Sequence, residues 1–390
     1  MRKGRSRRTD VYTIHNNVKI IRGGADYFNA LLKMVDNATD TIHLQTYIYD
    51  NDETGGAVTD ALIRAAARKV RIFVLLDGYA SQRLPEAVIE RFRDAGIEFA
   101  FFSPMFRRSS FYLGRRLHHK VVVADGRECL VGGLNISNRY NDIGDRSAWL
   151  DWAVHVEGEV ARPLHEVCKN LWNRSLLRKK CTTDLRASFT PPAEECPVRI
   201  SRNDWVFKKT EITRRYLEML NHAQSHVVIL SSYFWPSARL LRGMERAAAR
   251  GVQVQLILTG TADVPFAKNA ERYLYNRLFR SNIEVFEYQR NILHGKIAVC
   301  DKQWLTVGSY NVNNISAYAS VELNLDINSQ QVAAGLANNI RHIINDDCIR
   351  VTRAGFAASN GLLSRFLQYC SYRFIHMVFF LFTFYFRQRK

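Results

Sequence analysis

Cysteine, proline and acidic residues are all sparse in this chain of 390 residues. The seven cysteines are odd in number and none stands in a Cys-x-x-Cys pair, which fits a reducing compartment better than a disulfide framework. Eight prolines and 47% hydrophobic residues exclude a collagen-like fibre and a disordered chain. We therefore expect a folded protein with a sizeable core, divided into roughly two or three domains.

Acidic residues are outnumbered, with 37 Asp and Glu against 55 Lys and Arg, so the formal net charge is +18. This excess favours an anionic partner, which could be nucleic acid, a phosphorylated small molecule or an acidic lipid surface. Five of the basic residues lie in residues 1–10, and no apolar segment follows them. We expect a solvated tail or a phosphate-attracted arm there, and not a secretory signal.

The apolar run near the end of the sequence is too short to cross a membrane comfortably. Residues Phe374–Phe386 read FIHMVFFLFTFYF, a run of 13 residues, whereas a spanning helix needs about 20. Arginines precede this run, basic residues follow it, and no acidic residue occurs after Gly361. The pattern favours a helix at the membrane surface over a last helix that packs into the core.

Two stretches of the sequence resemble each other. Thr41–Gly78 and Val227–Gly260 both read as an apolar strand, a helix ending in AAAR and a second apolar strand. A further helix and a short strand follow each stretch, at 84–102 and 267–288. Strands that alternate with helices indicate βαβ units, and continuous apolar strands are typical of sheets covered on both faces.

The duplication predicts an α/β fold with two α/β/α sandwich domains related by a pseudo-twofold axis. We expect mixed, mostly parallel sheets, followed by a C-terminal amphipathic or apolar membrane-associated helix. The expected boundaries are a basic tail (1–10), a first domain (11–180), a linker (181–197), a second domain (198–350) and a C-terminal membrane-associating segment (351–390).

One polar motif occurs twice, once in each half. Its pattern is H-x-K-x4-D-x6-G-[GS]-x-N, first in LHHKVVVADGRECLVGGLN and again in LHGKIAVCDKQWLTVGSYN. The polar members of the two copies are His118, Lys120, Asp125 and Asn135, and His294, Lys296, Asp301 and Asn311. A single His-x-Lys would carry no information, but the same offsets at matching places of a duplicated domain are a strong signal.

The motif residue types suit the chemistry of a phosphodiester. Histidine and lysine two residues apart on a strand point to the same face. If the two copies meet, two imidazoles, two ammonium groups and two amides surround one cavity, and the last two kinds of group donate hydrogen bonds to an anion with several oxygens. One histidine can attack phosphorus while the other protonates the leaving oxygen. No carboxylate or cysteine cluster accompanies them, so we expect neither a metal nor another cofactor.

The two motif aspartates are candidates for the catalytic set, but their spacing argues for a different role. Asp125 and Asp301 each lie an odd number of residues from their lysine, so on a strand they face away from it. We expect them to tie backbone turns or to pair with charge behind the site, in preference to direct chemistry.

At these residues the chain resembles the phospholipase D superfamily, whose HKD motifs have this pattern. Within that superfamily it is similar to the bacterial cardiolipin synthases of the shorter B type, with the strings LLDGY and HHKVVVADGRECLVGGLNIS in support. The resemblance covers residues 10 to 350 approximately. It implies transfer of a phosphatidyl group from one phosphatidylglycerol to another, giving cardiolipin and glycerol through a phosphatidyl-histidine.

The resemblance also implies roles for single residues. His118 would be the nucleophile and His294 the general acid and then the base, although the near-symmetry of the motifs leaves the assignment open. Lys120, Lys296, Asn135 and Asn311 would hold the phosphate. Family members place a carboxylate behind each histidine to fix its tautomer, and by position the candidates are Asp151 and Glu322.

Three substrate classes remain open from the residues alone: phosphatidyl transfer, phospholipase D-type hydrolysis, and a nuclease of the same superfamily. The segment SPMFRRSSFYLGRRLHHK mixes aromatic and basic residues, and the apolar run at the end of the sequence suits a bilayer. Both favour phosphatidylglycerol and an anionic membrane surface as partners, with no nucleic acid. We expect a peripheral or monotopic protein on the inner membrane of a bacterium, on its cytoplasmic face.

Overall fold

The computed structural model describes residues 11–104, 115–175, 181, 185–186, 189–261, 264–313, 316–317 and 320–387. The basic tail at 1–10, most of the aromatic and basic segment before the first motif (105–114) and part of the expected linker lie outside these residues. Their expected roles are therefore not addressed by the fold.

The first half of the chain forms one mixed sheet with the strand order β4–β3–β2–β6–β7–β8–β1. Its strands are β1 (Thr13–Arg22), β2 (Thr41–Thr46), β3 (Arg71–Asp77), β4 (Glu98–Phe102), β6 (Lys120–Ala124), β7 (Glu128–Gly132) and β8 (Trp152–Gly158).

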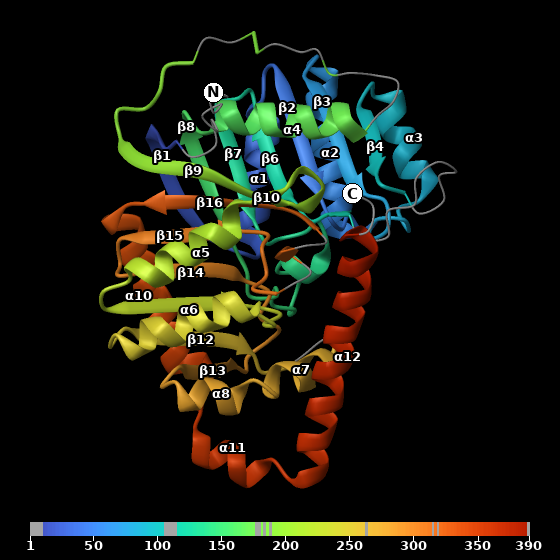
Figure 1. Ribbon diagram of the computed structural model, residues 1–390. Helices are drawn as coiled ribbons and strands as arrows, with labels where there is room; N and C mark the ends of the chain where they lie inside the picture. Colours follow the sequence, from blue (N-terminus) through green and yellow to red (C-terminus); the bar gives the residue numbers. More distant parts are fainter. Residues whose placement is uncertain are drawn as a thin grey trace, which may run out of the picture.

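The second half repeats this order as β13–β12–β11–β14–β15–β16–β9, with short strands added at its edges. Its strands are β9 (Glu195–Asp204), β10 (Lys209–Thr210), β11 (His226–Ser231), β12 (Gln253–Thr259), β13 (Glu284–Tyr288), β14 (Lys296–Cys300), β15 (Trp304–Gly308), β16 (Ser320–Asn328) and β17 (Cys348–Val351). In Figure 1 the strands of the two sheets run in clearly different directions.

The expectation of mostly parallel sheets is wrong. In the first sheet only β2–β3 and β3–β4 are parallel, and the other pairs are antiparallel. The parallel pairs are those whose strands are joined through helices, whereas β6 and β7 are joined by a tight turn at Asp125 and Gly126, both with positive φ. A short turn reverses the chain, so the motif strands must run antiparallel.

Helices cover both faces of each sheet. On the outer face of the first sheet lie α1 (Ala25–Asn37), α2 (Glu53–Ala67) and α3 (Glu86–Asp94), and on that of the second lie α5 (Glu211–His222), α6 (Ala238–Ala249) and α8 (Tyr275–Arg280). Residues of α4 (Ala161–Ser175) and α10 (Gln330–Asp347) pack in one cluster with residues of both sheets. This shared cluster makes the two halves one body, because its apolar side chains lose contact with water only when the halves meet.

The backbones of the two halves pair with each other at two places. Each place lies directly before a motif histidine. The short strand β5 (Arg116–Leu117), just before the first motif, pairs in parallel with the start of β16. In the same way Leu293, just before the second motif, forms a bridge to Leu150, just before β8. Each motif thus begins directly after a backbone pairing with the other half.

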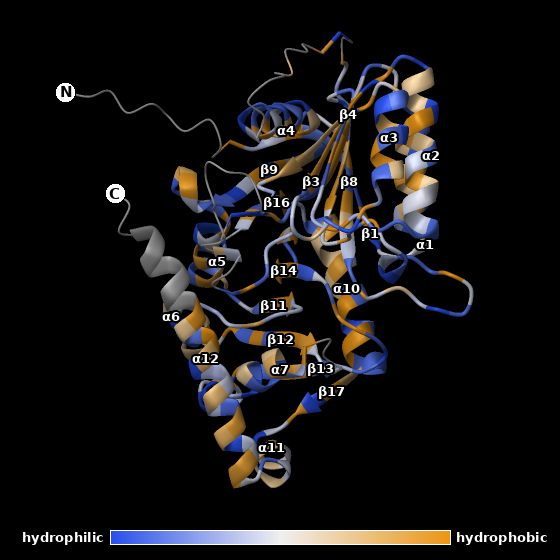
Figure 2. Cartoon of the chain, turned by 90° about the vertical axis from the view of Figure 1, so that its right-hand side faces the viewer, coloured by the Kyte–Doolittle hydropathy of each residue, from blue (hydrophilic) through white to orange (hydrophobic). Residues whose placement is uncertain are grey.

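The last helix, α12 (Leu362–Arg387), lies beside α7 (Pro265–Arg272), as Figure 1 shows. In Figure 2 apolar and polar residues alternate along its described surface, on the opposite side of the molecule from α1 to α3. The short α11 (Arg353–Ser359) precedes it. Within the described residues, no helix combines the length and the apolar character that crossing a bilayer requires.

Candidate active site

His118 sits between β5 and β6 and contacts the second half of the chain. Its backbone N–H donates to the carbonyl of Val321 at 3.0 Å, which fixes the position of the ring. Its Nδ1 lies 2.9 Å from Glu322 Oε2 and 3.0 Å from the carbonyl oxygen of Ser309. Because both neighbours are acceptors, Nδ1 carries the proton, and the lone pair lies on Nε2.

His294 has the reciprocal environment, built by the first half. Its backbone N–H donates to the carbonyl of Leu150 at 2.8 Å, and its Nδ1 lies 2.6 Å from Asp151 Oδ2. Its Nε2 lies 3.3 Å from the hydroxyl of Tyr140, a residue that is almost completely buried. The carboxylates of Asp151 and Glu322 are fully buried, and each contacts the histidine of the opposite half.

Burial lowers the pKa of both imidazoles, although Glu322 opposes this effect at His118. Both rings are therefore neutral at pH 7, which is the form that can attack or accept a proton. The pKa of Asp151 is raised to about 7 by its burial, and Lys296 opposes that rise. An anionic ligand in the cavity would favour the protonated form of His294, as a general acid requires.

The two motif lysines are buried beside the histidines. Lys120 Nζ donates to the carbonyl of His118 at 3.0 Å, and Lys296 Nζ donates to the carbonyl of His294 and, at 3.2 Å, to Ser232 Oγ. Burial, followed by the charge of Lys296, lowers the pKa of Lys120 to about 7. Two ammonium groups that repel each other in a buried site are stabilised when an anion binds between them.

The two motif asparagines are held by their side-chain oxygens. Asn135 Oδ1 accepts from the backbone N–H of Ile48 at 3.1 Å, and Asn311 Oδ1 accepts from Ser232 Oγ at 3.0 Å. Asn135 also donates to the hydroxyl of Tyr140 at 2.8 Å. Anchoring the oxygens directs N–H groups of both amides to the shared cavity, where they can donate to an anion.

These side chains share a cavity of about 390 Å³. Both motif histidines and both motif asparagines line it. The structure therefore brings these residues of the two motifs together in one cavity. The remaining lining is mostly aromatic and polar: Tyr47, Ile48, Arg116, Arg139, Tyr140, Trp149, Tyr233, Trp235, Val264, Ala267, Asn313, Ser316 and Ser320. The volume is enough for a glycerophosphate headgroup, with space left toward the rim.

The motif aspartates lie at the far ends of their strands from the lysines. Asp125 accepts hydrogen bonds from the backbone N–H groups of Thr39, Asp40 and Thr41, which lead into β2. Asp301 does the same for residues 224–226, which lead into β11, and against the opposing effect of burial these bonds lower its pKa to about 2. This matches the turn-tying alternative, since each carboxylate joins the β-turn of its motif to the neighbouring strand.

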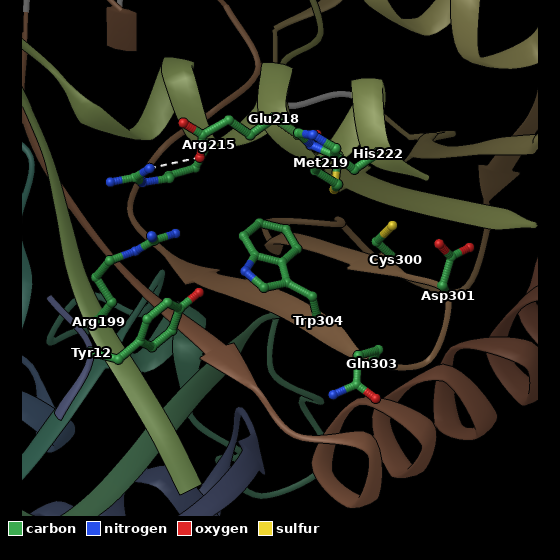
Figure 3. A pocket seen from close by; sticks show the side chains of 10 residues that line it. All are labelled: Tyr12, Arg199, Arg215, Glu218, Met219, His222, Cys300, Asp301, Gln303 and Trp304. Carbon is green, nitrogen blue, oxygen red and sulfur yellow. Dashed lines mark hydrogen bonds and ion pairs between the residues drawn. The ribbon is translucent and has the colours of Figure 1, made fainter. Parts of the chain in front are cut away.

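Asp301 also lines a second cavity, of about 310 Å³, that is separate from the histidine pair (Figure 3). Two arginines reach this cavity, and both have carboxylate partners: Arg199 contacts Asp326 at 3.2 Å and Arg215 contacts Glu218 at 2.6 Å. Because these positive charges are already compensated, the second cavity is not a strong anion site.

A group of side chains with the spacing of metal ligands lies away from the motif histidines. In the described part of the chain, one group of side chains has metal-ligand spacing, and it consists of Glu128, His155 and Glu157 on β7 and β8. His155 Nε2 lies 2.5 Å from Glu128 Oε1, so these two groups already satisfy each other. None of the three lines the cavity of the motif histidines.

Sequence reasoning missed Tyr140, whose hydroxyl joins Asn135 to His294 Nε2. It follows Asn135 by five residues, and the corresponding position of the second motif is Ser316. A tyrosine in a polar stretch gives no periodic signal, so the contact depends on the fold. Arg116, Trp149 and Tyr47 at the cavity were likewise not assigned to the site, although Arg116 belongs to the basic segment noted in the sequence.

Comparison with known proteins agrees with this geometry. A family model described as cardiolipin synthase, phospholipase D-like domain, matches residues 31–172 and 216–344. The chain belongs to this family. The two matched segments contain the two histidine motifs, and the match confirms the resemblance that the duplicated motif indicated.

Related proteins of this family carry the same description. The cardiolipin synthase B of Shigella flexneri is 34% identical over 341 residues, which are 86% of this chain and 82% of that protein. The cardiolipin synthase B of Salmonella typhimurium is 36% identical with the same coverage. The crystal structure of phosphatidylserine synthase from Haemophilus influenzae has a TM-score of 0.71 and 15% identity, covering 88% of this chain and 90% of that one. That likeness supports the fold.

Proposed function

We propose that this protein is a cardiolipin synthase, a phosphatidyltransferase that uses two molecules of phosphatidylglycerol. The observation that carries the proposal is the pair of histidines in one cavity, each with its Nδ1 against a buried carboxylate of the other half. Such a pair can perform two successive displacements at phosphorus. The family and the cardiolipin synthase B relatives support the choice of lipid.

In the first displacement, His118 Nε2 attacks the phosphorus of one phosphatidylglycerol. A P–N bond forms, the bond from phosphorus to the glycerol headgroup breaks, and the leaving oxygen takes a proton from His294. The buried lysines and the motif amides donate to the phosphate oxygens, which carry the charge of the transition state. The product of this step is a phosphatidyl-histidine and free glycerol.

In the second displacement, a headgroup hydroxyl of another phosphatidylglycerol attacks the same phosphorus. His294, now neutral, accepts the hydroxyl proton, the P–N bond breaks and His118 is released. The new diester is cardiolipin. If water took the place of the second lipid, the product would be phosphatidic acid. The acceptor, lipid or water, therefore decides whether the site acts as a synthase or as a hydrolase.

Mass spectrometry of the lipid products tests this proposal. Purified protein incubated with phosphatidylglycerol vesicles is expected to form cardiolipin and glycerol in equal amounts, and His118→Ala serves as the inactive control. Phosphatidic acid as the main product would contradict the transfer reaction. Cleavage of added DNA without any lipid product would contradict the lipid substrate altogether.

The donor groups of the cavity suit metal-free catalysis. Imidazole, guanidinium and amide groups line it, the ammonium groups of the motif lysines lie beside the histidines, and the carboxylates of Glu322 and Asp151 are engaged with the histidines. Charge stabilisation by these donors needs no divalent cation. We expect full activity in excess EDTA, and a loss that one added divalent metal restores would contradict this part of the proposal.

The protein acts in this proposal as a peripheral or monotopic protein on the cytoplasmic face of the bacterial inner membrane. The net charge of +18 and the C-terminal segment 351–390, basic and apolar, favour an anionic membrane surface. Truncation after Gly361 should weaken binding to phosphatidylglycerol vesicles more than turnover of a detergent-dispersed substrate. Equal sedimentation of both proteins with vesicles would remove the anchoring role.

A further inference from the structure

The C-terminal helix packs directly against a wall of the catalytic cavity. Tyr372 and Ile375 of α12 pack on a small apolar cluster that includes Trp235 and Ala267. Trp235 and Ala267 also line the cavity of the two histidines. A single layer of side chains therefore separates α12 from the site.

An apolar strip on the surface begins at the rim of that cavity. Val264 lines the cavity and is 44% exposed, and Phe266 on α7 is 43% exposed. The ring of Phe266 meets the ring of Phe374 on α12 edge-on, with centroids 5.5 Å apart, and Phe374 is 51% exposed. We call Val264, Phe266, Phe374 and Met377 the rim strip.

Other exposed apolar residues extend the rim strip along α12. They are Leu362, Leu363, Phe366, Leu367 and Tyr369. Scattered single residues of this kind are normal on protein surfaces, but exposed apolar residues that gather on one helix next to a catalytic cavity mark an interaction surface. Water-exposed aromatic rings on such a surface are stabilised when hydrocarbon covers them.

The charge around the rim strip identifies what covers it. From Cys348 to the last residue the sequence has seven Arg and Lys and no Asp or Glu. Arg365 and Arg373 belong to the same helix as Phe374. In α12, apolar rings next to arginines in a segment without acidic residues fit an anionic bilayer, where the rings reach the acyl chains and the arginines meet lipid phosphates.

We propose that the rim strip is the surface through which the acyl chains of phosphatidylglycerol pass from an anionic bilayer to the catalytic cavity. This inference rests on the proposed function, because it assigns a substrate path to that site. It differs from simple anchoring, since an anchor could lie anywhere on the molecule. The rim strip instead joins the bilayer to the edge of the site at Val264.

The test compares one chemistry on two physical forms of the substrate. The double variant Phe266→Ser/Phe374→Ser removes two exposed rings and leaves the groups of the cavity in place. Its matched control is Ile14→Ser, which changes an exposed apolar residue on β1 in the other half. Both proteins should keep the melting temperature of the parent within about 2 °C, as surface changes do.

On vesicles of phosphatidylglycerol the double variant is expected to lose about tenfold or more in rate and to bind the vesicles less tightly. On dihexanoyl phosphatidylglycerol, dispersed as monomers, its rate should stay within about twofold of the parent, because no bilayer has to be contacted. The Ile14→Ser control should match the parent on both substrates.

Three outcomes would overturn the inference. They are unchanged rates on vesicles, equal losses on both substrates, and a dimer in the parent protein that the double variant breaks while vesicle binding is unchanged. The last would make the rim strip a contact between copies of the chain. If the parent protein forms no cardiolipin from either substrate, the proposed function fails, and vesicle binding of the double variant still tests the rim strip.

Discussion

The two halves of this molecule have the same strand order and the same motif, yet they surround their histidines differently. Strand register makes Asp151 and Glu322 equivalent, because Gly132 pairs with Ala153 in one sheet and Gly308 with Asn324 in the other. In the first half the shorter side chain, Asp151, lies against Gly133. A Cβ added at Gly133 would lie 2.4 Å from the Asp151 oxygens. In the second half the longer side chain, Glu322, lies against Ser309 and accepts a hydrogen bond from its hydroxyl.

The hydrogen-bond partners of the two imidazoles also differ. His118 has two acceptors at Nδ1, Glu322 and the carbonyl of Ser309, which hold its proton away from Nε2. His294 Nε2 faces the hydroxyl of Tyr140, and Ser316 occupies the equivalent position in the second motif. Two copies of one sequence pattern thus surround their imidazoles with different hydrogen-bond partners, which is the basis for proposing different roles for them.

Removing either histidine should have the largest effect, a loss of more than about 10³-fold in turnover of phosphatidylglycerol. The two variants should differ on a phosphatidyl ester of p-nitrophenol, whose leaving group needs no proton. On that substrate His294→Ala should still release a burst of p-nitrophenol, and His118→Ala should not. A burst from His118→Ala and not from His294→Ala would show that His294 is the nucleophile and His118 the proton donor.

Neutralising the buried carboxylates should have the next largest effect. Asp151→Asn and Glu322→Gln keep the shape of the side chain, but an amide can present an N–H to Nδ1 and favour the wrong tautomer. We expect each to lower kcat by roughly 10²-fold with little change in KM. Because the contacts cross between halves, Glu322→Gln should suppress the p-nitrophenol burst, whereas Asp151→Asn should leave it intact. The reverse pattern would contradict the crossed pairing.

The Tyr140→Phe variant should have a smaller effect, about three- to tenfold in kcat. It removes the hydroxyl that contacts both Asn135 and His294 Nε2 and keeps the buried ring. Ser316→Ala, at the equivalent position, is the control and should keep its activity within about twofold. If both variants lost the same activity, the proposed difference between the halves would not lie at this position.

The smallest expected effect concerns stability in acid. The first half buries His43 against Phe73 and His165, whereas strand register places Val228 at the equivalent position of the second half. Burial lowers the pKa of His43 well below its usual value, and it lowers that of His165 to about 4. The folded state therefore binds fewer protons than the unfolded state, and stability is lost as the pH falls below about 6.5.

His43→Val should reduce this acid sensitivity by about 1–2 kcal/mol between pH 7.5 and pH 5. Urea unfolding of the parent and the variant at both pH values measures the difference. His222→Val, a change at an exposed histidine, is the control and should leave the pH dependence unchanged. An identical pH dependence for the parent and His43→Val would show that other groups control acid unfolding.

Much of the local structure could be predicted from the sequence. The strands and helices of both repeats lie where the apolar pattern placed them, except that the single helix expected at the start of 267–288 is divided into α7 and α8. The two motifs meet in one cavity because the halves pack through a shared core. Strand direction was wrongly predicted for the motif strands, since the apolar runs did not reveal that their short connections reverse the chain.

The sequence by itself determined which residues lie on the same face of a strand or helix within each half. Periods of two and 3.6 residues are local, so they place His and Lys on one face of a strand without any knowledge of the other half. The tertiary structure decided which carboxylate meets which histidine, and that Tyr140 reaches His294. Those contacts join residues 143 to 204 positions apart. They form because the residues just before each motif pair with the backbone of the other half, and no local pattern in the sequence records that pairing.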